Sequence, residues 1–129
     1  SKQGETALDI AAYAAHMAAL LGAHVIKVKP PTDALEQPEA TSVYQATNLP
    51  RSTLAERVDH IMQASFAGRR IVVFSGGAAK DRDGLLNEVR GLRDGGANGS
   101  IIGRNTFQRP RDEALDLLGD IIDIYRGKL

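Results

Sequence analysis

Three short apolar segments alternate with helical patterns along this chain of 129 residues. The segments cover residues 23–29, 71–74 and 100–102, and each contains adjacent β-branched residues, which favour strands. Apolar strands that alternate with amphipathic helices are typical of a parallel sheet covered by helices. We therefore expect an α/β fold in which right-handed crossovers place the three strands side by side.

The helical segments carry recognisable start and stop signals. Thr6 with Asp9, and Thr53 with Glu56, have the spacing of a capping box, and Gly22 and Gly68 are natural stops. These signals predict helices over residues 6–21, 53–67 and 82–94, a short helical turn at 106–108 and a last helix that opens at Pro110. The apolar face expected for the last helix consists of Leu115, Leu118, Ile121, Ile122 and Tyr125.

Residues 30–52 differ from the rest of the chain, because four of the five prolines lie there. A segment of this length without regular structure is usually a lid, an insertion or a mobile loop. We expect a proline-rich loop or insertion within the domain, with a short helix near residues 42–46.

Two completions of the predicted sheet are possible: a doubly wound open sheet, or part of a (β/α)₈ barrel. A barrel needs about 250 residues, so this chain could supply about half of one. Three strands alone would leave open sheet edges. We therefore expect the chain to be a piece of a larger protein.

Composition excludes several classes of function. The 16 Lys+Arg balance the 16 Asp+Glu, which argues against a general binder of nucleic acid. The chain has no Cys, and so no thiolate nucleophile, which fits a reducing compartment. No apolar run approaches a membrane span, and the N-terminus has no signal-peptide character.

Lys27 is the most unusual residue, because it lies within an apolar strand. Side chains alternate along a strand, so Lys27 and Lys29 share a face opposite Ile26 and Val28, and in a barrel that face is the interior. A lysine that burial keeps neutral attacks carbonyl carbon and forms a Schiff base. The alternatives are that Lys27 pairs with a carboxylate on an adjacent strand and that Lys29 reaches solvent.

Glycine turns end the other two strands. The N–H groups of Ser75-Gly76-Gly77 could face an anion, although Gly-Gly is also an ordinary tight turn. Gly103-Arg104-Asn105 opens the short helix, where N–H groups and a guanidinium suit a phosphate; the alternative for Arg104 is a surface ion pair. Together with Lys27 on the preceding strand, the two turns predict carbonyl chemistry on a phosphorylated substrate.

Other candidate residues are weaker. His16 and His60 are predicted to be surface or packing residues of helices, and His24 to be exposed. Lys80 could reach a phosphate but is more simply a solvated loop lysine. No set of His, Asp and Glu has convincing metal-ligand spacing, so no metal site is predicted.

Three motifs in this order resemble those of the class I fructose-bisphosphate aldolases of the archaeal and bacterial type. They are Val25-Ile26-Lys27-Val28-Lys29, Phe74-Ser75-Gly76-Gly77 and Ile102-Gly103-Arg104-Asn105-Thr106-Phe107-Gln108. The resemblance covers essentially the whole chain. It implies that residues 1–129 are the C-terminal part of a single TIM-barrel aldolase domain, about strands six to eight with their helices, with residues 30–52 as the proline-rich insertion.

The resemblance also implies an activity and a site. Lys27 would form the Schiff base, with Lys29 as a secondary candidate, in the cleavage of fructose 1,6-bisphosphate to dihydroxyacetone phosphate and glyceraldehyde 3-phosphate. Neither metal nor other cofactor would be used. The phosphate would be held by Ser75, Gly76, Gly77, Gly103 and Arg104.

The acid–base residues of this family would precede Ser1, so we expect the 129 residues alone to be inactive. The expected partners are a sugar-phosphate substrate, the missing N-terminal half of the barrel and further copies in a homo-oligomer, but neither nucleic acid nor membrane; the expected location is the cytoplasm. Two alternatives remain: a related lysine-dependent aldolase or thiolase for another sugar phosphate, and a non-catalytic phosphate-binding module.

Overall fold

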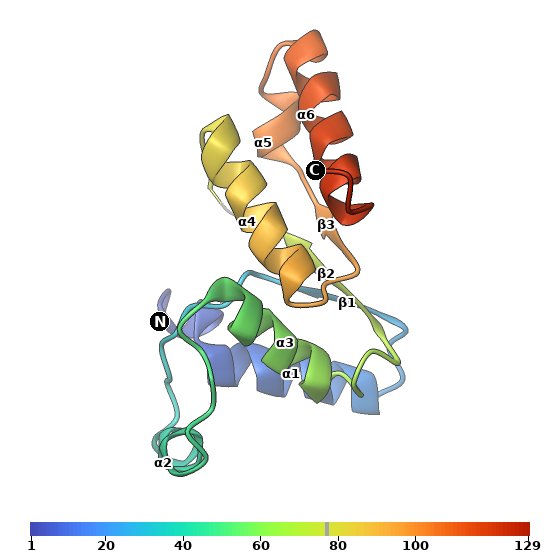
Figure 1. Ribbon diagram of the computed structural model, residues 1–129. Coiled ribbons are helices and arrows are strands. Elements are labelled where there is room, and N and C mark those ends of the chain that lie inside the picture. Colours follow the sequence, from blue (N-terminus) through green and yellow to red (C-terminus); the bar gives the residue numbers. More distant parts are fainter. Residues whose placement is uncertain (77) are drawn as a thin grey trace.

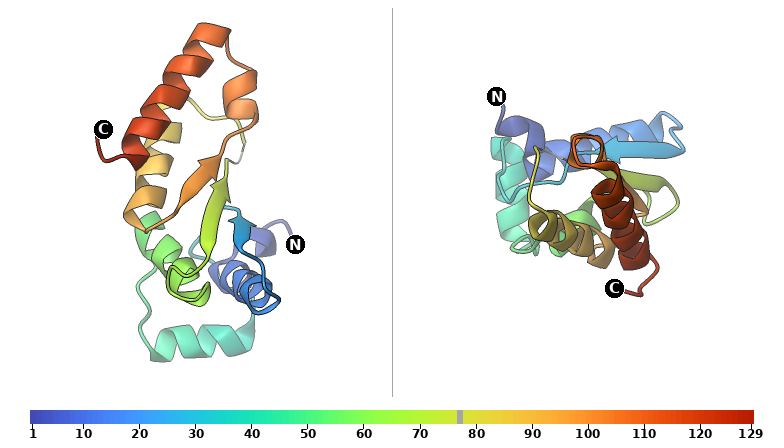
Figure 2. Two further views of the ribbon diagram at one scale, coloured as in Figure 1. Left: turned by 90° about the vertical axis from the view of Figure 1, so that its right-hand side faces the viewer. Right: turned by 90° about the horizontal axis from the view of Figure 1, so that it is seen from above.

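The computed structural model of the protein describes residues 1–76 and 78–129 and contains one sheet of three strands. The strands β1 (Val25–Val28), β2 (Ile71–Ser75) and β3 (Gly99–Ile101) are parallel and lie in the order β1-β2-β3. Figure 2 shows the three arrows side by side, all pointing the same way. The prediction of a parallel sheet with neighbouring strands is confirmed, although β3 begins and ends one residue earlier than expected.

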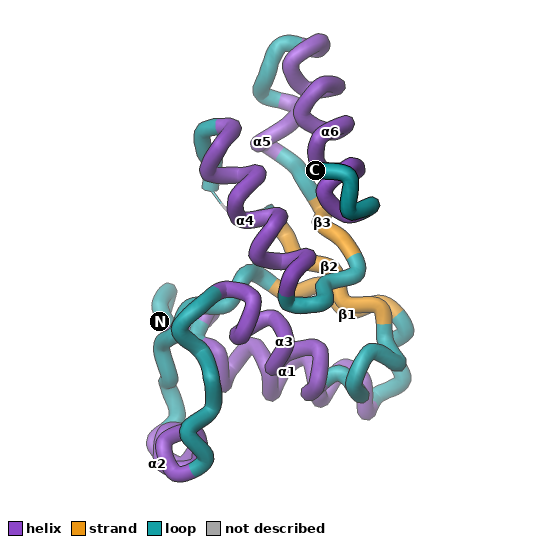
Figure 3. The backbone as a smooth tube through the Cα atoms, in the orientation of Figure 1, coloured by secondary structure: helices purple, strands orange, loops and turns teal. Residues whose placement is uncertain are grey.

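Helices precede, separate and follow the three strands along the chain. The main helices are α1 (Leu8–Leu20), α3 (Leu54–Ala64), α4 (Arg82–Asp94) and α6 (Arg111–Tyr125), and each packs on the next (Figure 1). Three short helices complete the set, namely η1 (Gly4–Thr6), α2 (Pro38–Ala46) and α5 (Arg104–Phe107). The loops that join them to the strands are visible in Figure 3. No helix in residues 1–76 or 78–129 is both long enough and apolar enough to cross a membrane.

The row of helices covers one face of the sheet. On that face Ile26, Val72 and Phe74 are buried against α1 and α3. On the opposite face Val25, Ile71 and Ile101 are 58%, 50% and 48% exposed, and within the described residues no helix covers them. A doubly wound sheet has helices on both faces, whereas a barrel has them on the outside only. The arrangement therefore favours the barrel, with the uncovered face as its interior.

One expectation about helices is wrong and a second, the apolar face of α6, is right for Ile121 and Tyr125 but wrong for Leu115 and Ile122. Thr6 and Asp9 do not form a capping box, because α1 begins after Ala7 and the buried Asp9 carboxylate instead accepts hydrogen bonds from the N–H groups of Glu36 and Gln37 (2.8–3.1 Å). In α6 the buried residues are Leu117, Ile121 and Ile124, which face α4, whereas Leu115 and Ile122 are 51% and 49% exposed. The predicted capping box of Thr53 and Glu56 is present.

The 30–52 segment is fastened to the preceding and following helices at several points, of which two involve buried or half-buried side chains. Asp9 holds its first part, and the Tyr44 hydroxyl of α2 lies 2.6 Å from His60 Nε2 of α3. Burial lowers the pKa of His60 and raises the pKa of Tyr44; the charge of Asp59 raises the pKa of His60 but by less than burial lowers it. The helix predicted at 42–46 is present and starts earlier, at Pro38, a residue suited to the first helical turn.

The lowered pKa of His60 predicts a pH dependence of stability. An unfolded histidine has a pKa near 6.5 and binds a proton more readily than folded His60. The contribution of His60 to the free energy of unfolding should therefore be constant above about pH 7.5 and should fall as the pH drops through about 6.5. Urea unfolding at pH 7.5 and 5.5 measures this difference, and His60→Gln should reduce it. His24→Gln, which alters an exposed histidine, should leave it unchanged; an equal effect of both variants would contradict the assignment.

Candidate active site

A hollow of about 360 Å³ lies beyond the carboxyl ends of β1 and β2, next to the start of α5. In parallel α/β folds this edge of the sheet is where ligands bind. The hollow brings together four residues singled out from the sequence: Lys29, Ser75, Gly76 and Arg104. Among the described residues its lining consists of Thr6, Lys29, Pro30, Ser75, Gly76, Ala78, Lys80, Glu88 and Arg104.

The two glycine turns differ from the expectation in detail. Gly76 donates its N–H to Ile101 O at 3.0 Å, and a β-carbon placed on Gly76 would have Asn105 Nδ2 as its nearest neighbour, at 3.6 Å. Gly103 caps the start of α5 with a negative φ of −108° and does not line the hollow. A β-carbon on Gly76 would therefore find room, and Gly77 lies outside the described residues.

Charged side chains surround the hollow, and two of its three cations are already paired. Lys29 Nζ lies 2.5 Å from Glu5 Oε2, and this hydrogen bond and charge lower the pKa of Glu5. The ammonium of Lys80 pairs with the carboxylate of Glu88 on α4. In the described part of the chain no side chain forms an ion pair with the exposed guanidinium of Arg104. Arg104 is therefore the cation that an incoming anion meets without displacing a carboxylate.

Lys27 lies outside the lining of the hollow but on the same face of the sheet as Ser75. In the register of the sheet Lys27 pairs with Val73, two residues before Ser75, and residues two apart in a strand point to the same face. The side chain of Lys27 is exposed on the uncovered face, and no carboxylate in residues 1–76 or 78–129 pairs with it. The alternative of a carboxylate partner on β2 is thus not observed there.

Two residues that the sequence left without a role join the loops around the hollow. Asn105 is 3% exposed, accepts from Lys80 N at 2.8 Å through Oδ1 and donates to Ala78 O at 3.2 Å through Nδ2. Arg109 donates to Asn105 O at 2.7 Å and to Lys80 O at 2.9 Å. No local sequence signal identifies these roles, because the partners are backbone atoms of the 78–80 segment.

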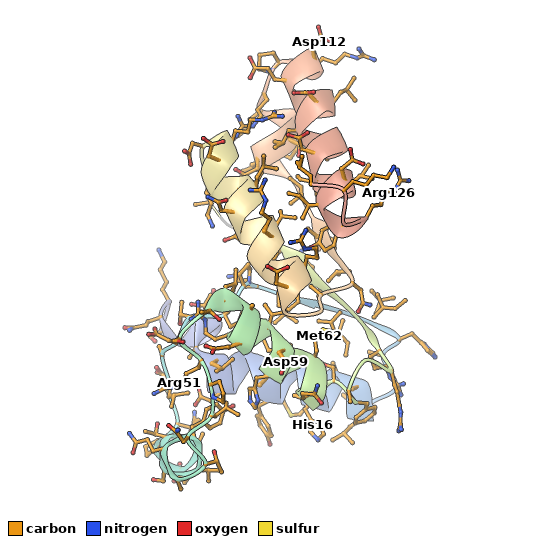
Figure 4. All side chains as sticks on the ribbon, in the orientation of Figure 1. His16, Arg51, Asp59, Met62, Asp112 and Arg126 are labelled. Atoms are coloured by element: carbon orange, nitrogen blue, oxygen red, sulfur yellow. The ribbon has the colours of Figure 1, made fainter. Side chains whose placement is uncertain are left out.

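Other hollows and histidines offer less chemistry. A larger hollow of about 470 Å³ beside Asp59 and His60 lies on α3, away from the ends of the strands, and no lysine lines it. His16 Nδ1 bonds Ala64 O at 2.8 Å and its ring packs edge-on against Phe66, so it is a packing residue. Figure 4 labels His16 and Asp59 on the helices α1 and α3. Among the described residues no group of three His, Asp or Glu could hold a metal ion.

Comparisons with known proteins point to one group of enzymes. The family model described as DeoC/LacD family aldolase matches residues 2–109. A Chlamydia muridarum protein named "Probable fructose-bisphosphate aldolase class 1" is 32% identical over 129 residues, which cover 93% of this chain and 36% of that protein. A Halobacterium salinarum protein named "Fructose-bisphosphate aldolase class 1" is 38% identical over 109 residues, which cover 82% of this chain and 32% of that protein.

Solved structures agree with the sequence relatives. An archaeal fructose 1,6-bisphosphate aldolase superposes with a TM-score of 0.70 at 28% identity, covering 95% of this chain and 39% of that one. A Schiff base forming fructose-1,6-bisphosphate aldolase superposes with a TM-score of 0.68 at 27% identity, covering 93% and 38%. The chain thus spans less than two fifths of the length of these relatives. The predicted fold class, an α/β part of a (β/α)₈ barrel, is confirmed.

Proposed function

This chain belongs to the DeoC/LacD aldolase family, and from that premise we propose that it supplies part of a class I, Schiff-base fructose-bisphosphate aldolase. In this proposal Lys27 is the nucleophile and the hollow beside β2 holds a phosphate of the substrate. Residues 1–129 form the C-terminal part of the barrel, and residues 30–52 form an insertion within it. The related aldolases for other sugar phosphates and the non-catalytic module are not favoured, since the relatives are named fructose-bisphosphate aldolases.

The observation that carries the proposal is the placement of Lys27 relative to Ser75. The two residues lie on adjacent strands and on the same face, with Lys27 two positions before Ser75 in register. A rise of about 3.3 Å per residue and a strand spacing of about 4.8 Å separate their Cα atoms by roughly 8 Å. In a ketose phosphate three bonds separate the carbonyl carbon from the phosphorus. A substrate whose phosphate occupies the hollow can therefore present its carbonyl carbon to Lys27.

The proposed chemistry uses the primary amine of Lys27 as the nucleophile. Lys27 Nζ adds to the C2 carbonyl of the ketose, and loss of water gives an iminium. The C4 hydroxyl then gives its proton to a general base, the C3–C4 bond breaks, and its electron pair passes to the iminium, which leaves an enamine and releases the aldehyde. Protonation at C3 and hydrolysis free dihydroxyacetone phosphate and return Lys27 to the amine.

The phosphate contacts follow from the charges of the hollow. Arg104 offers a guanidinium that can bind two phosphate oxygens, and Ser75 offers a hydroxyl donor. The resemblance assigns backbone N–H groups of Gly76, Gly77 and Gly103 to the phosphate, but the Gly76 N–H is donated to Ile101 O and Gly103 does not line the hollow, so Arg104 and Ser75 carry the proposed contacts. Lys29 remains a secondary candidate for the nucleophile, although its ion pair with Glu5 makes it the less available amine.

We expect Arg104→Ala to raise the KM for fructose 1,6-bisphosphate by about 10- to 100-fold, since a bidentate charge-assisted contact is lost, each tenfold step being about 1.4 kcal/mol. The KM for an unphosphorylated ketose should change by less than about twofold. Steady-state assays of the complete protein that contains this chain measure both. The matched control is Arg111→Ala, which alters an 84% exposed arginine on α6. Equal effects of Arg104→Ala on both substrates would mean that Arg104 acts only through structure.

The proposal extends to the oligomeric state and the cellular location of the protein. The exposed apolar residues Val25, Ile71 and Ile101 on the uncovered face support completion by the remaining strands of the barrel, and Tyr13, Leu20 and Leu21 on and just after α1 support contact with further parts of the assembly. We place the enzyme in the cytoplasm as a homo-oligomer, in keeping with a chain free of cysteine. Light scattering of the complete protein tests the oligomer; a strict monomer would contradict it.

A further inference from the structure

We propose that Asn105 is a positioning residue that joins the two loops of the phosphate site, so that its loss weakens phosphate binding without removing the chemistry of Lys27. The inference rests on the proposed function of the hollow. It concerns a side chain that does not line the hollow and does not touch the substrate.

The amide of Asn105 connects two parts of the chain that are far apart in sequence. Asn105 lies on α5, directly after Arg104, and its side chain is buried while that of Arg104 is exposed. Through Oδ1 it accepts from Lys80 N at 2.8 Å, and through Nδ2 it donates to Ala78 O at 3.2 Å. One amide therefore fixes the 78–80 segment after β2 to the segment that carries Arg104.

The backbone of Lys80 is held on both of its polar groups. Its N–H is donated to Asn105 Oδ1, and its carbonyl accepts from Arg109 Nη2 at 2.9 Å. Arg109 also donates through Nε to the carbonyl of Asn105 at 2.7 Å. The three residues form a closed set of hydrogen bonds in which Lys80 is placed by α5 and the arginine that follows it.

The same amide lies against the other glycine turn. A β-carbon on Gly76 would have Asn105 Nδ2 as its nearest neighbour at 3.6 Å, so the side chain of Asn105 packs behind the turn whose front lines the hollow. Two lining residues are therefore linked directly to Asn105, Lys80 by a hydrogen bond and Arg104 as its neighbour in the chain. A binding site that must hold its groups to a fraction of an ångström depends on such support.

The substitution Asn105→Ala leaves Lys80 N and Ala78 O without their partner and frees the 78–80 segment. We expect the dihydroxyacetone phosphate concentration that gives half-maximal borohydride trapping to rise about tenfold. The maximal trapping rate should stay within about threefold, and trapping with unphosphorylated dihydroxyacetone should stay within about twofold. A purely structural role would lower trapping with both ketones alike.

The matched control is Asn98→Ala. Asn98 also bonds a strand through its amide, with Val72 N donating to Oδ1 at 2.8 Å, but it lies at the opposite edge of the sheet. Its loss should leave the ratio between the two ketones unchanged. If Asn105→Ala fails to fold, Arg109→Gln removes the bond to Lys80 O alone and should raise the half-maximal concentration about threefold.

Hydrogen exchange distinguishes a failure of the role of Asn105 from a failure of the proposed function. Asn105→Ala should speed exchange of the Lys80 amide, which bonds the Asn105 side chain, and Asn98→Ala should not. Unchanged exchange at Lys80, or an unchanged ratio between the ketones in a wild type that traps both, overturns the role of Asn105 and leaves the proposed function standing. A wild type that traps neither ketone overturns the proposed function, and exchange at Lys80 still decides whether Asn105 joins the loops.

Discussion

The Lys27→Met variant of the complete protein should form no Schiff base, and its rate of aldol cleavage should fall by at least about 10⁴-fold. The reason is that this amine makes the covalent bond between enzyme and substrate on which the proposed cycle depends. The fold should survive, since methionine has similar bulk and carries no charge to bury. Borohydride reduction in the presence of dihydroxyacetone phosphate, followed by peptide mass spectrometry, measures the loss directly.

Lys29→Met is the control for this experiment. Lys29 shares the face of Lys27 but is paired with Glu5, so its removal should leave trapping on the Lys27 peptide intact. Because Lys29 lines the hollow, the variant can alter the KM for a phosphorylated ketose. Trapping found on Lys29 in the wild type would reverse the assignment of the two lysines.

A second large effect is expected at the contact between α3 and α4. A β-carbon on Gly95 would lie 2.5 Å from Val58 Cβ and 2.6 Å from Ala55 O, so Gly95→Ala forces the two helices apart. Overpacking of this kind costs about 1–3 kcal/mol, and a clash with backbone places the cost in the upper part of that range. The midpoint of urea unfolding should fall accordingly.

Gly119→Ala is the matched control for Gly95→Ala. Gly119 lies within α6, and a β-carbon there meets no atom within 4 Å. Replacing an exposed helical glycine by alanine stabilises a helix by about 0.5–1 kcal/mol, so the midpoint should rise slightly. A Gly95→Ala protein as stable as the Gly119→Ala protein would contradict the close packing of α3 on α4.

Local sequence signals predicted the structure correctly where the interacting residues lie close together in the chain. The capping box of Thr53 and Glu56 and the bounds of α4 were predicted correctly, because both depend on residues within one or a few turns. The capping box at Thr6 was wrong, because Asp9 bonds backbone groups 27 and 28 residues further on. No local sequence pattern indicates a hydrogen-bond partner that lies so far along the chain.

The buried face of α6 was predicted only in part, for a different reason. Its apolar residues are so numerous that two helical stripes are possible, and only the position of α4 selects the one with Leu117, Ile121 and Ile124. The position of Ser75 and Arg104 beside the hollow could be predicted, because Ser75 ends β2 and Arg104 lies shortly after β3, at the edge where parallel sheets bind ligands. Asn105 could not be assigned a role, since its partners are backbone atoms of another loop.

The hydrophobic core is divided between two clusters, and the candidate site spans both. One cluster joins α1, α3 and Leu92 near the end of α4 to β1 and β2, and so lies beneath Lys27. The other joins the rest of α4 to α6, next to the segment that carries Arg104. Such units can open separately at a free-energy cost below that of global unfolding. Transient opening of the α4–α6 unit would weaken phosphate binding while β1, which carries Lys27, stays folded. Proteolytic cleavage in that unit should therefore abolish substrate affinity before it abolishes the reactivity of the Lys27 amine.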